Sequence, residues 1–239
     1  MTDSVRERGD RHVWNPMSRM SDVLGRQRDL VRGSGSTLFD ESGRGYIDAC
    51  ASLWYVHVGY GRDEIVAAVE RQLSQLPSWM LFGPNLNRPA VDLAERLAAL
   101  TPGDLNRMDF TCGGSEAVET AIKIARQYFR LLSQPGRYKV IARRGSYHGS
   151  TFGALSATGT RHHRQMFEPL VPGFRHIDPF SISALRETIA LEGPDTIAAM
   201  IVDPCVAASG IHLPQDDYFQ TVRDVCSEHG IDAARTQGR

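Results

Sequence analysis

Two glycines and a serine, Gly113, Gly114 and Ser115, stand between a short apolar segment and a long amphipathic one. This pattern predicts a strand over 107–111, a tight turn and a helix over 115–132. Glycines let a backbone approach a ligand closely, and the free N–H groups at a helix start favour an anion. We therefore interpret the turn as a phosphate site, with Gly114 and Ser115 as its main residues. An ordinary turn with a serine N-cap would have the same short pattern.

An aromatic and an imidazole side chain follow the next predicted strand, over 138–142. The loop after it, Gly145–Thr151, contains Tyr147 and His148. Ligands of open α/β sheets bind at the carboxyl ends of strands, so this loop is well placed to contact one. Tyr147 could be a core aromatic, although its place on a loop makes burial in the core less natural. His148 could orient the loop through a hydrogen bond, or it could be an exposed or internally bonded histidine.

Several segments, in their order along the chain, resemble those of the class III (omega) aminotransferases, which are fold-type I enzymes that use pyridoxal phosphate. The resemblance extends from about residue 12 to residue 230. It implies pyridoxal 5′-phosphate as the cofactor, with its phosphate at Gly114 and Ser115 and its ring on Tyr147. The matching segments are Trp14–Pro16, Tyr46–Asp48, Leu53–Gly61, Gly113–Ala117, Tyr147–Gly149, Val202–Pro204, Ser209–Gly210 and Leu213–Pro214.

The resemblance also assigns roles outside the phosphate site. It implies that His148 and Asp203 contact the cofactor, although Asp203 replaces the usual glutamate and is one methylene shorter, which leaves its contact open. Trp54 becomes a wall of the substrate pocket, with a packing tryptophan as the alternative. The segment Trp79–Phe82 corresponds to one that lines a neighbouring subunit's site, which implies a homodimer. The implied substrates are small molecules, an amine or amino acid and a keto acid or aldehyde.

The lysines do not match the family's chemistry, which needs a Schiff-base lysine. The chain contains only Lys123 and Lys139. Lys123 lies eight residues along the predicted helix from Ser115, on the order of 12 Å at 1.5 Å per residue. Lys139 opens a strand at the end opposite the ligand edge. We therefore expect no catalytic lysine among these residues and no transamination by this chain alone.

Two interpretations follow, and the sequence leaves both open. The segment Asp232–Arg239 departs from the family pattern, in which an apolar strand carries an aspartate for the pyridine nitrogen. In the first interpretation the chain is an aminotransferase that is truncated or frame-shifted before the Schiff-base lysine. In the second it is a catalytically silent fragment that binds pyridoxal phosphate or another subunit.

The order of the predicted elements indicates an α/β fold. Strands and helices alternate from residue 107, which predicts a mostly parallel sheet covered by helices on both faces. With the resemblance, the expected fold is a truncated fold-type I pyridoxal-phosphate transferase. We expect residues 1–60 to form an N-terminal arm and small-domain segment, and residues 61–239 an incomplete large cofactor-binding domain. The remaining predicted elements are an extended arm over 1–35 with a solvated tail, a hairpin over 37–48, helices over 62–76, 89–100, 149–156, 181–191 and 216–229, and a strand over 197–202.

Composition excludes several classes of partner. A formal net charge of -1 over 239 residues gives no electrostatic footprint for nucleic acid or an anionic membrane. No run of eighteen apolar residues predicts a membrane span. The four cysteines form no Cys-x-x-Cys pair, so we expect reduced thiols in the cytoplasm and no zinc site. His162 and His163 with His148 lack further ligands at standard spacing, so we expect no metal.

Overall fold

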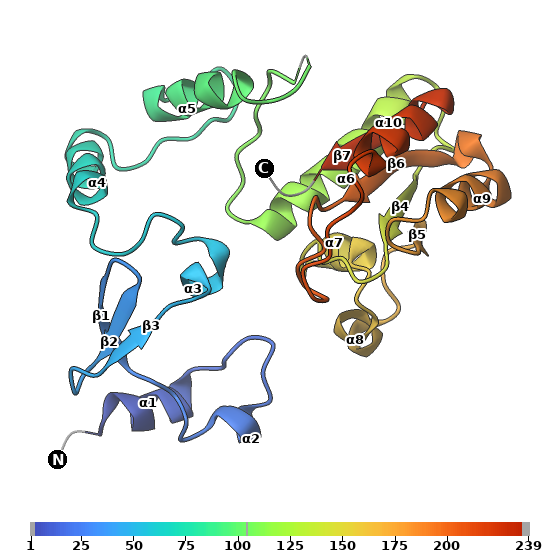
Figure 1. The fold of residues 1–239 in the computed structure, drawn as a ribbon. Helices are drawn as coiled ribbons and strands as arrows, with labels where there is room; N and C mark the ends of the chain where they lie inside the picture. The colour runs from blue at the N-terminus through green and yellow to red at the C-terminus, as the bar shows by residue number, and fades with distance from the viewer. Residues whose placement is uncertain (1–2, 104, 236–239) are drawn as a thin grey trace. The chain divides into compact units, whose positions relative to one another are not determined.

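The computed structural model describes residues 3–103 and 105–235. Its contacts divide the chain into two compact units, Met1–Arg96 and Leu97–Arg239 (Figure 1). The predicted boundary at residue 60 separates a small domain from a large one. A division of the chain into compact units by contacts does not test that boundary. It therefore stays a prediction.

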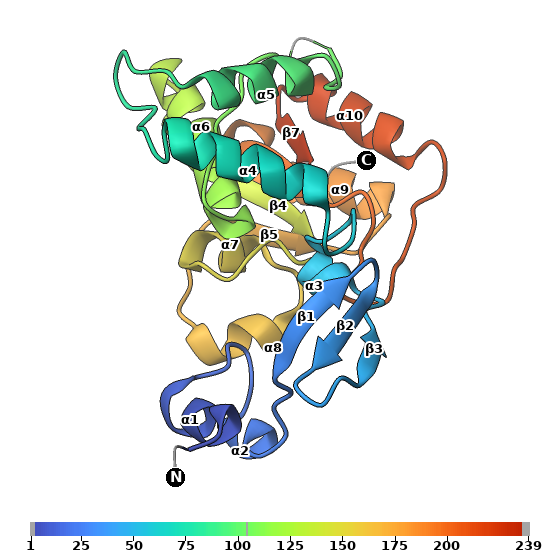
Figure 2. The same cartoon turned by 90° about the vertical axis from the view of Figure 1, so that its left-hand side faces the viewer.

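A small antiparallel sheet organises the first unit. It contains β1 (Leu30–Ser34), β2 (Thr37–Asp40) and β3 (Gly45–Ile47) in that order (Figure 2). The predicted hairpin is therefore present as β2 and β3. The extended arm predicted over 1–35 is wrong in its last residues, because β1 pairs with the open edge of the hairpin and satisfies its backbone groups.

The predicted N-terminal tail is solvated, but it forms helix α1 (Val5–His12), which was not predicted. The backbone N–H of Ser4 donates to Glu7 Oε2 at 2.7 Å, and the N–H of Glu7 donates to Ser4 Oγ at 3.3 Å. This reciprocal capping box satisfies two donors that the helix start would otherwise leave unpaired. Alternating charges predicted solvation correctly, since no residue of α1 is buried, but solvation does not prevent a helix. A short helix, α2 (Met20–Val23), follows.

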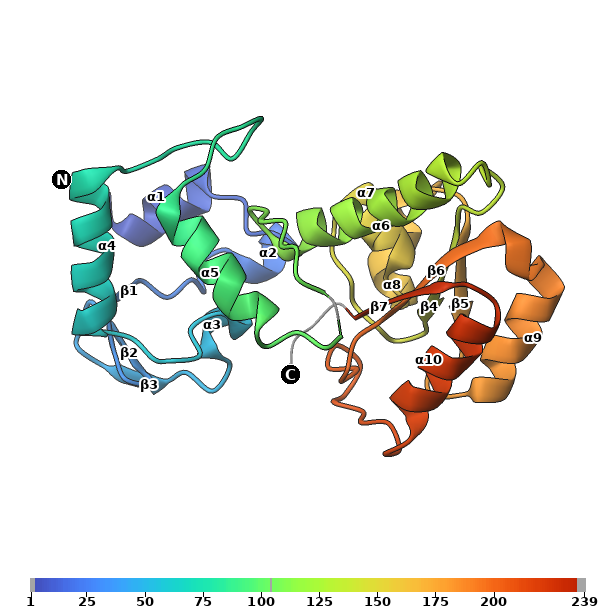
Figure 3. The same cartoon turned by 90° about the horizontal axis from the view of Figure 1, so that it is seen from above.

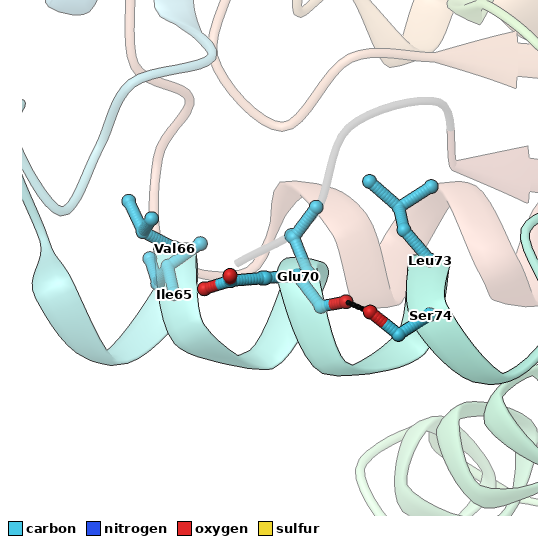
Figure 4. Close-up of a pocket in the computed structure, with 6 residues that line it drawn as sticks. Ile65, Val66, Glu70, Leu73 and Ser74 are labelled. Atoms are coloured by element: carbon cyan, nitrogen blue, oxygen red, sulfur yellow. Dashed lines mark hydrogen bonds between the residues drawn. The ribbon is translucent and has the colours of Figure 1, made fainter.

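The remaining helices of the first unit are α3 (Ala51–Trp54), α4 (Asp63–Gln75) and α5 (Arg88–Ala98). The two predicted amphipathic helices correspond to α4 and α5. Val66 and Leu73 project from the same side of α4 (Figure 4), and both are more than half exposed. No residue of α4 is buried, so its apolar side is an exposed surface of this unit.

A four-stranded parallel sheet forms the centre of the second unit, in the order β5-β4-β6-β7. Helices α6 and α7 cover one face, and α9 and α10 cover the other (Figure 3). The predicted parallel sheet with helices on both faces is confirmed. The elements are α6 (Gly114–Leu131), β4 (Lys139–Arg143), α7 (Phe152–Ala157), α8 (Arg161–Arg164), a 3-10 turn (Gln165–Phe167), β5 (Phe174–Ile177), α9 (Ile182–Glu192), a 3-10 turn (Pro194–Thr196), β6 (Ile197–Val202), α10 (Tyr218–Glu228) and β7 (Asp232–Arg235).

Strand β4 shows why the sheet needs both layers. Ile141 packs with the residues of α9 and α10, whereas Val140 and Ala142 pack with those of α6 and α7. Every residue of β6 is buried, as expected for a parallel strand covered on both sides. The parallel direction brings the carboxyl ends of all four strands to one edge, where the candidate site lies.

The predicted strand over 107–111 is wrong, because these residues form no strand. A strand needs a neighbour that receives its backbone hydrogen bonds, and neither edge strand of the described sheet pairs with this segment. The short strands β5 and β7 were not predicted. In the described ranges no helix combines the length and the apolar character that crossing a membrane requires.

Candidate functional site

The phosphate site was predicted at the residues that begin α6. Gly113 is the N-cap residue in an extended conformation, and no side chain caps the helix. A Cβ atom added at Gly113 or Gly114 would meet no other atom within 4 Å, so the space beside the turn is open. The first backbone N–H groups of a helix point outward along its axis and carry the positive end of its dipole. Such a helix start favours an anion, and the role of Gly114 and Ser115 as a phosphate site stays a prediction.

Ser115 joins the start of α6 to the loop that contains Tyr147. Its Oγ accepts a hydrogen bond from the backbone N–H of Ser150 at 3.0 Å. A hydroxyl group can donate one hydrogen bond and accept two, so Ser115 can still donate to an anion. Gly149 has a φ of 136°, and a Cβ there would lie 2.6 Å from Ser115 Oγ. Only glycine allows the loop to approach α6 this closely.

Glu119 lies one helical turn after Ser115 and was missed by the sequence analysis. Its Oε1 accepts hydrogen bonds from Thr151 Oγ1 at 2.6 Å, Gly153 N–H at 2.7 Å and Ala154 N–H at 3.1 Å. Burial raises the pKa of Glu119, but these hydrogen bonds outweigh it and leave the pKa below its ordinary value. The four-residue spacing from Ser115, which puts both on one helix face, was the available signal.

Tyr147 is half-buried on the loop after β4. Its ring packs edge-to-face against His163, with ring centroids 5.8 Å apart, and His163 in turn contacts His162 at 4.2 Å. Burial and the nearby His162 lower the pKa of His163. The histidine pair therefore supports the tyrosine ring. The stacking of Tyr147 on a cofactor ring stays a prediction.

His148 is buried, which removes the exposed alternative. Its backbone N–H donates to Thr158 Oγ1 at 2.9 Å, and that hydroxyl donates to the carbonyl of Gly149 at 3.1 Å. Burial lowers the pKa of the His148 imidazole to about 4, with Asp203 opposing the shift and Arg143 adding to it. The imidazole is therefore neutral at pH 7. Its contact with a cofactor stays a prediction.

Asp203 lies at the carboxyl end of β6 and is paired with a residue that sequence reasoning missed. Arg143 Nη2 donates to Asp203 Oδ1 at 2.8 Å and also to the Asp203 carbonyl. Arg143 ends β4, is fully buried, and its guanidinium lies 4.9 Å from the ring centroid of Phe180. The sequence offered little signal, since an arginine at the end of an apolar strand is more often exposed. The predicted cofactor contact of Asp203 remains untested.

Trp54 belongs to the first unit, where it ends α3 with a φ of 62° and is half exposed. Ser52 has a φ of 60°, so this turn holds non-glycine residues in a strained conformation. Asp48 stabilises the turn by accepting hydrogen bonds from Cys50 N–H at 3.1 Å and Tyr60 Oη at 2.8 Å. The role of Trp54 as a pocket wall stays a prediction.

The two lysines lie where the sequence predicted. Lys139 begins β4, at the end of the strand opposite Arg143, and its Nζ lies 2.8 Å from Glu192 Oε2. Arg175 pairs with the same carboxylate, and the hydrogen bonds from Arg175 and Lys139 lower the pKa of Glu192 to about 2. Lys123 is exposed on α6. Within the described residues, no group of three His, Cys, Asp or Glu side chains is placed to hold a metal ion.

Comparison with known proteins connects this geometry to one family. The family model described as aminotransferase class-III matches residues 20–232. A probable aminotransferase of Mycobacterium tuberculosis is 44% identical over 219 residues, which cover 84% of this chain and 47% of that protein. The chain spans about half the length of the curated relatives it matches.

Solved structures of transaminases also resemble this chain. A transaminase from the marine bacterium Virgibacillus superposes with a TM-score of 0.94 at 33% identity, over 98% of this chain and 55% of that one. An omega transaminase from Pseudomonas jessenii in complex with PMP superposes with a TM-score of 0.92 at 30% identity, over 97% of this chain and 55% of that one. The match in fold therefore extends over nearly all of the chain.

Proposed function

The chain belongs to the class III aminotransferase family, and we propose that it carries the phosphate site and the ring-stacking loop of a transaminase that uses pyridoxal 5′-phosphate. Its fold is that of the fold-type I pyridoxal-phosphate transferases. The proposed reaction moves an amino group between an amine or amino acid and a keto acid or aldehyde.

One observation supports this function above the others, the contact of Ser115 with the 145–151 loop. Because Ser150 N–H donates to Ser115 Oγ, the open helix start and the loop of Tyr147 belong to one assembly. The N–H groups after Gly113 and the hydroxyl of Ser115 would hold the phosphate, and the ring of Tyr147 would support the pyridine ring. When bound, the cofactor supplies an electron sink for the removal of a proton from the substrate.

The rest of the site is proposed from burial and charge. His148 is neutral and held by Thr158, so it would orient the loop without adding a charge beside the cofactor. Asp203 would act from the edge where β4 and β6 end, with its position fixed by Arg143. Trp54 would contribute to the substrate pocket.

A second candidate function is a catalytically silent fragment that binds the cofactor or another subunit. The positions of the two lysines favour this second function for this chain alone. Lys139 forms an ion pair with Glu192 at the end of β4 away from the candidate site, and Lys123 is exposed on the side of α6. Neither amine is placed to reach a ring bound at Ser115. We therefore propose that these residues bind the cofactor without covalent attachment and without turnover.

We also propose a homodimer and a cytoplasmic location. Trp79, Leu81 and Phe82 expose 51%, 45% and 83% of their surface, which suits a segment that contacts a second copy. The four cysteines are free thiols, and two of them, Cys50 and Cys112, are exposed, as expected in a reducing compartment.

The experiment measures binding of pyridoxal phosphate to the purified chain by equilibrium dialysis. We expect weak, reversible binding that Ser115→Ala weakens about tenfold or more, since a hydrogen bond to a charged group contributes about 1.5–3 kcal/mol. Ser227→Ala, an exposed serine of α10, is the matched control and should bind as the wild type does. Equal binding by wild type and Ser115→Ala would remove the phosphate site from the proposal.

A companion experiment tests the absence of covalent chemistry. The complex is reduced with borohydride, labelled lysines are mapped by mass spectrometry, and transaminase activity is assayed with several amine donors. We expect at most trace labelling and no turnover. Stoichiometric labelling of Lys123 or Lys139 together with turnover would contradict the proposal.

A further inference from the structure

Ser115 and Glu119 act on the same segment of chain from one face of α6. They are four residues apart, which places their side chains side by side along the helix. Ser115 Oγ accepts the N–H of Ser150, and Glu119 Oε1 accepts the N–H groups of Gly153 and Ala154. The loop after β4 and the start of α7 are therefore held at two points one turn apart.

Two glycines allow this contact. A Cβ at Gly149 would lie 2.6 Å from Ser115 Oγ, and a Cβ at Gly153 would lie 2.2 Å from Glu119 Oε2. Both distances are shorter than real Cβ contacts. A Cβ at Gly149 would also lie 2.9 Å from Ser115 Cα, so a larger residue there would push the segment away from α6, whereas one at Gly153 would displace the Glu119 carboxylate. The spacing of the glycines repeats the spacing of the two side chains that they face.

The carboxylate of Glu119 also completes α7. Thr151, the N-cap residue of that helix, makes no side-chain cap hydrogen bond, and its Oγ1 donates to Glu119 instead. Glu119, which belongs to α6, thereby accepts the first-turn N–H groups of α7 that a side-chain cap would otherwise satisfy. A negative charge at a helix start is favourable, and hydrogen bonds to an ionised acceptor are stronger than neutral ones.

From this arrangement we propose that Glu119 is a positioning residue. By hydrogen-bonding the 149–154 segment to α6, a contact that we call the clamp, it fixes the position of Tyr147 relative to the proposed phosphate site. Glu119 would not touch the cofactor itself, because it lies one turn beyond Ser115 and all of its hydrogen bonds go to the segment. The proposal rests on the proposed function for the identity of the ligand. The clamp, in contrast, can be measured without any ligand.

Hydrogen–deuterium exchange of the full chain tests the clamp. In Glu119→Ala we expect the amides over 149–157 to exchange at least about tenfold faster, while those of β4 stay protected. Glu119→Gln, which keeps Oε1 as an uncharged acceptor, should lie between Glu119→Ala and the wild type. Glu187→Ala removes an exposed glutamate of α9 and should leave the exchange of the segment unchanged. Unchanged exchange in Glu119→Ala would overturn the clamp.

Binding of two probes tests the positioning role. Pyridoxal phosphate needs both the phosphate site and the ring of Tyr147, whereas inorganic phosphate needs only the former. We expect Glu119→Ala to weaken pyridoxal phosphate roughly three- to tenfold more than inorganic phosphate, the range of a lost aromatic stacking contact. Equal weakening of both probes would mean general damage and would overturn the positioning role.

A second variant keeps the test valid if Glu119→Ala folds poorly. Thr151→Val removes one donor to Glu119 and preserves the shape of the side chain, so it should change the ratio of the two affinities in the same direction by a smaller factor. A wild-type chain that binds neither probe would overturn the proposed function and the positioning role with it. The exchange experiment would then still decide whether the clamp exists.

Discussion

Arg143 and Asp203 form an ion pair of 2.8 Å that joins the carboxyl ends of β4 and β6, and both side chains are almost fully buried. The pair is 60 residues apart in sequence. It lies at the edge of the sheet where ligands of such folds bind. It therefore fixes the relative position of the two strands that carry the 145–151 loop and Asp203.

Breaking this pair from one side should be strongly destabilising. Arg143→Met leaves the Asp203 carboxylate buried without its partner, which we expect to lower the free energy of unfolding by about 3–5 kcal/mol. Urea denaturation of the full chain measures the change. Combining it with Asp203→Leu should recover much of the loss, because both charges are then gone. A double variant as unstable as Arg143→Met would contradict this account.

Two histidines, the buried His148 and the half-buried His176, should make the second unit sensitive to mild acid. Burial lowers the pKa of His148 to about 4, below the 6.5 of an unfolded histidine, and the same holds for His176. As the pH falls from about 6.5 to 4, the unfolded chain takes up protons that the folded chain does not. Stability is therefore lost over this range, by up to about 3 kcal/mol for each group.

Urea denaturation at pH 7 and pH 5 checks this prediction, with NMR titration of the imidazoles as a direct measurement. His148→Gln should reduce the loss between the two pH values. His57→Gln, in the first unit, is the control and should leave it unchanged. A His148 imidazole that titrates near pH 6.5 in the folded chain would contradict the prediction.

The exposed apolar side of α4 should promote self-association. Val66 and Leu73 expose 60% and 55% of their surface and project together (Figure 4). Light scattering at micromolar concentration should find species larger than the monomer, and Val66→Glu with Leu73→Glu should reduce them. Arg71→Glu changes charge on the same helix without removing an apolar contact and serves as the control. A compact wild-type monomer that is insensitive to salt would count against the prediction.

Local patterns predicted the strongly periodic elements well. Helix α6 was expected over 115–132 and spans Gly114–Leu131, because its apolar residues repeat at helical spacing over five turns. The strand over 107–111 failed, because a strand depends on a partner that the local sequence does not specify. Helix α1 was missed although Ser4 and Glu7 have the spacing of a capping box, which outweighed the alternating charges.

The candidate site also contains residues that a local pattern predicted and residues that depend on distant partners. Gly114 and Ser115 were correctly predicted to begin a helix because a turn before a helix is a local pattern, and their role at a phosphate site stays a prediction. Arg143 was not found, because its partner Asp203 becomes a neighbour only when β4 and β6 pair. Glu119 stands between these cases, since its spacing from Ser115 is local but its hydrogen bonds depend on how the later loop folds back.

Gly149 offers the sharpest single test of the contact between α6 and the loop. Its φ of 136° lies where residues with a side chain are strained, and an added Cβ would also meet Ser115 Oγ at 2.6 Å. Gly149→Ala should therefore lower the free energy of unfolding by roughly 1–3 kcal/mol from backbone strain, with a further loss from the clash. It should also weaken the binding of pyridoxal phosphate, because the loop of Tyr147 is displaced from the phosphate site.

The matched control for that variant is Gly136→Ala, in the turn before β4. A Cβ at Gly136 meets no atom within 4 Å, and its φ is not in the left-handed region. This change should be neutral or stabilising by a few tenths of a kcal/mol, since alanine restricts the unfolded chain. Denaturation curves and dialysis of both variants separate a general effect of replacing glycine from the specific one. If Gly149→Ala matched Gly136→Ala in stability and binding, the close packing of the loop on α6 would be refuted.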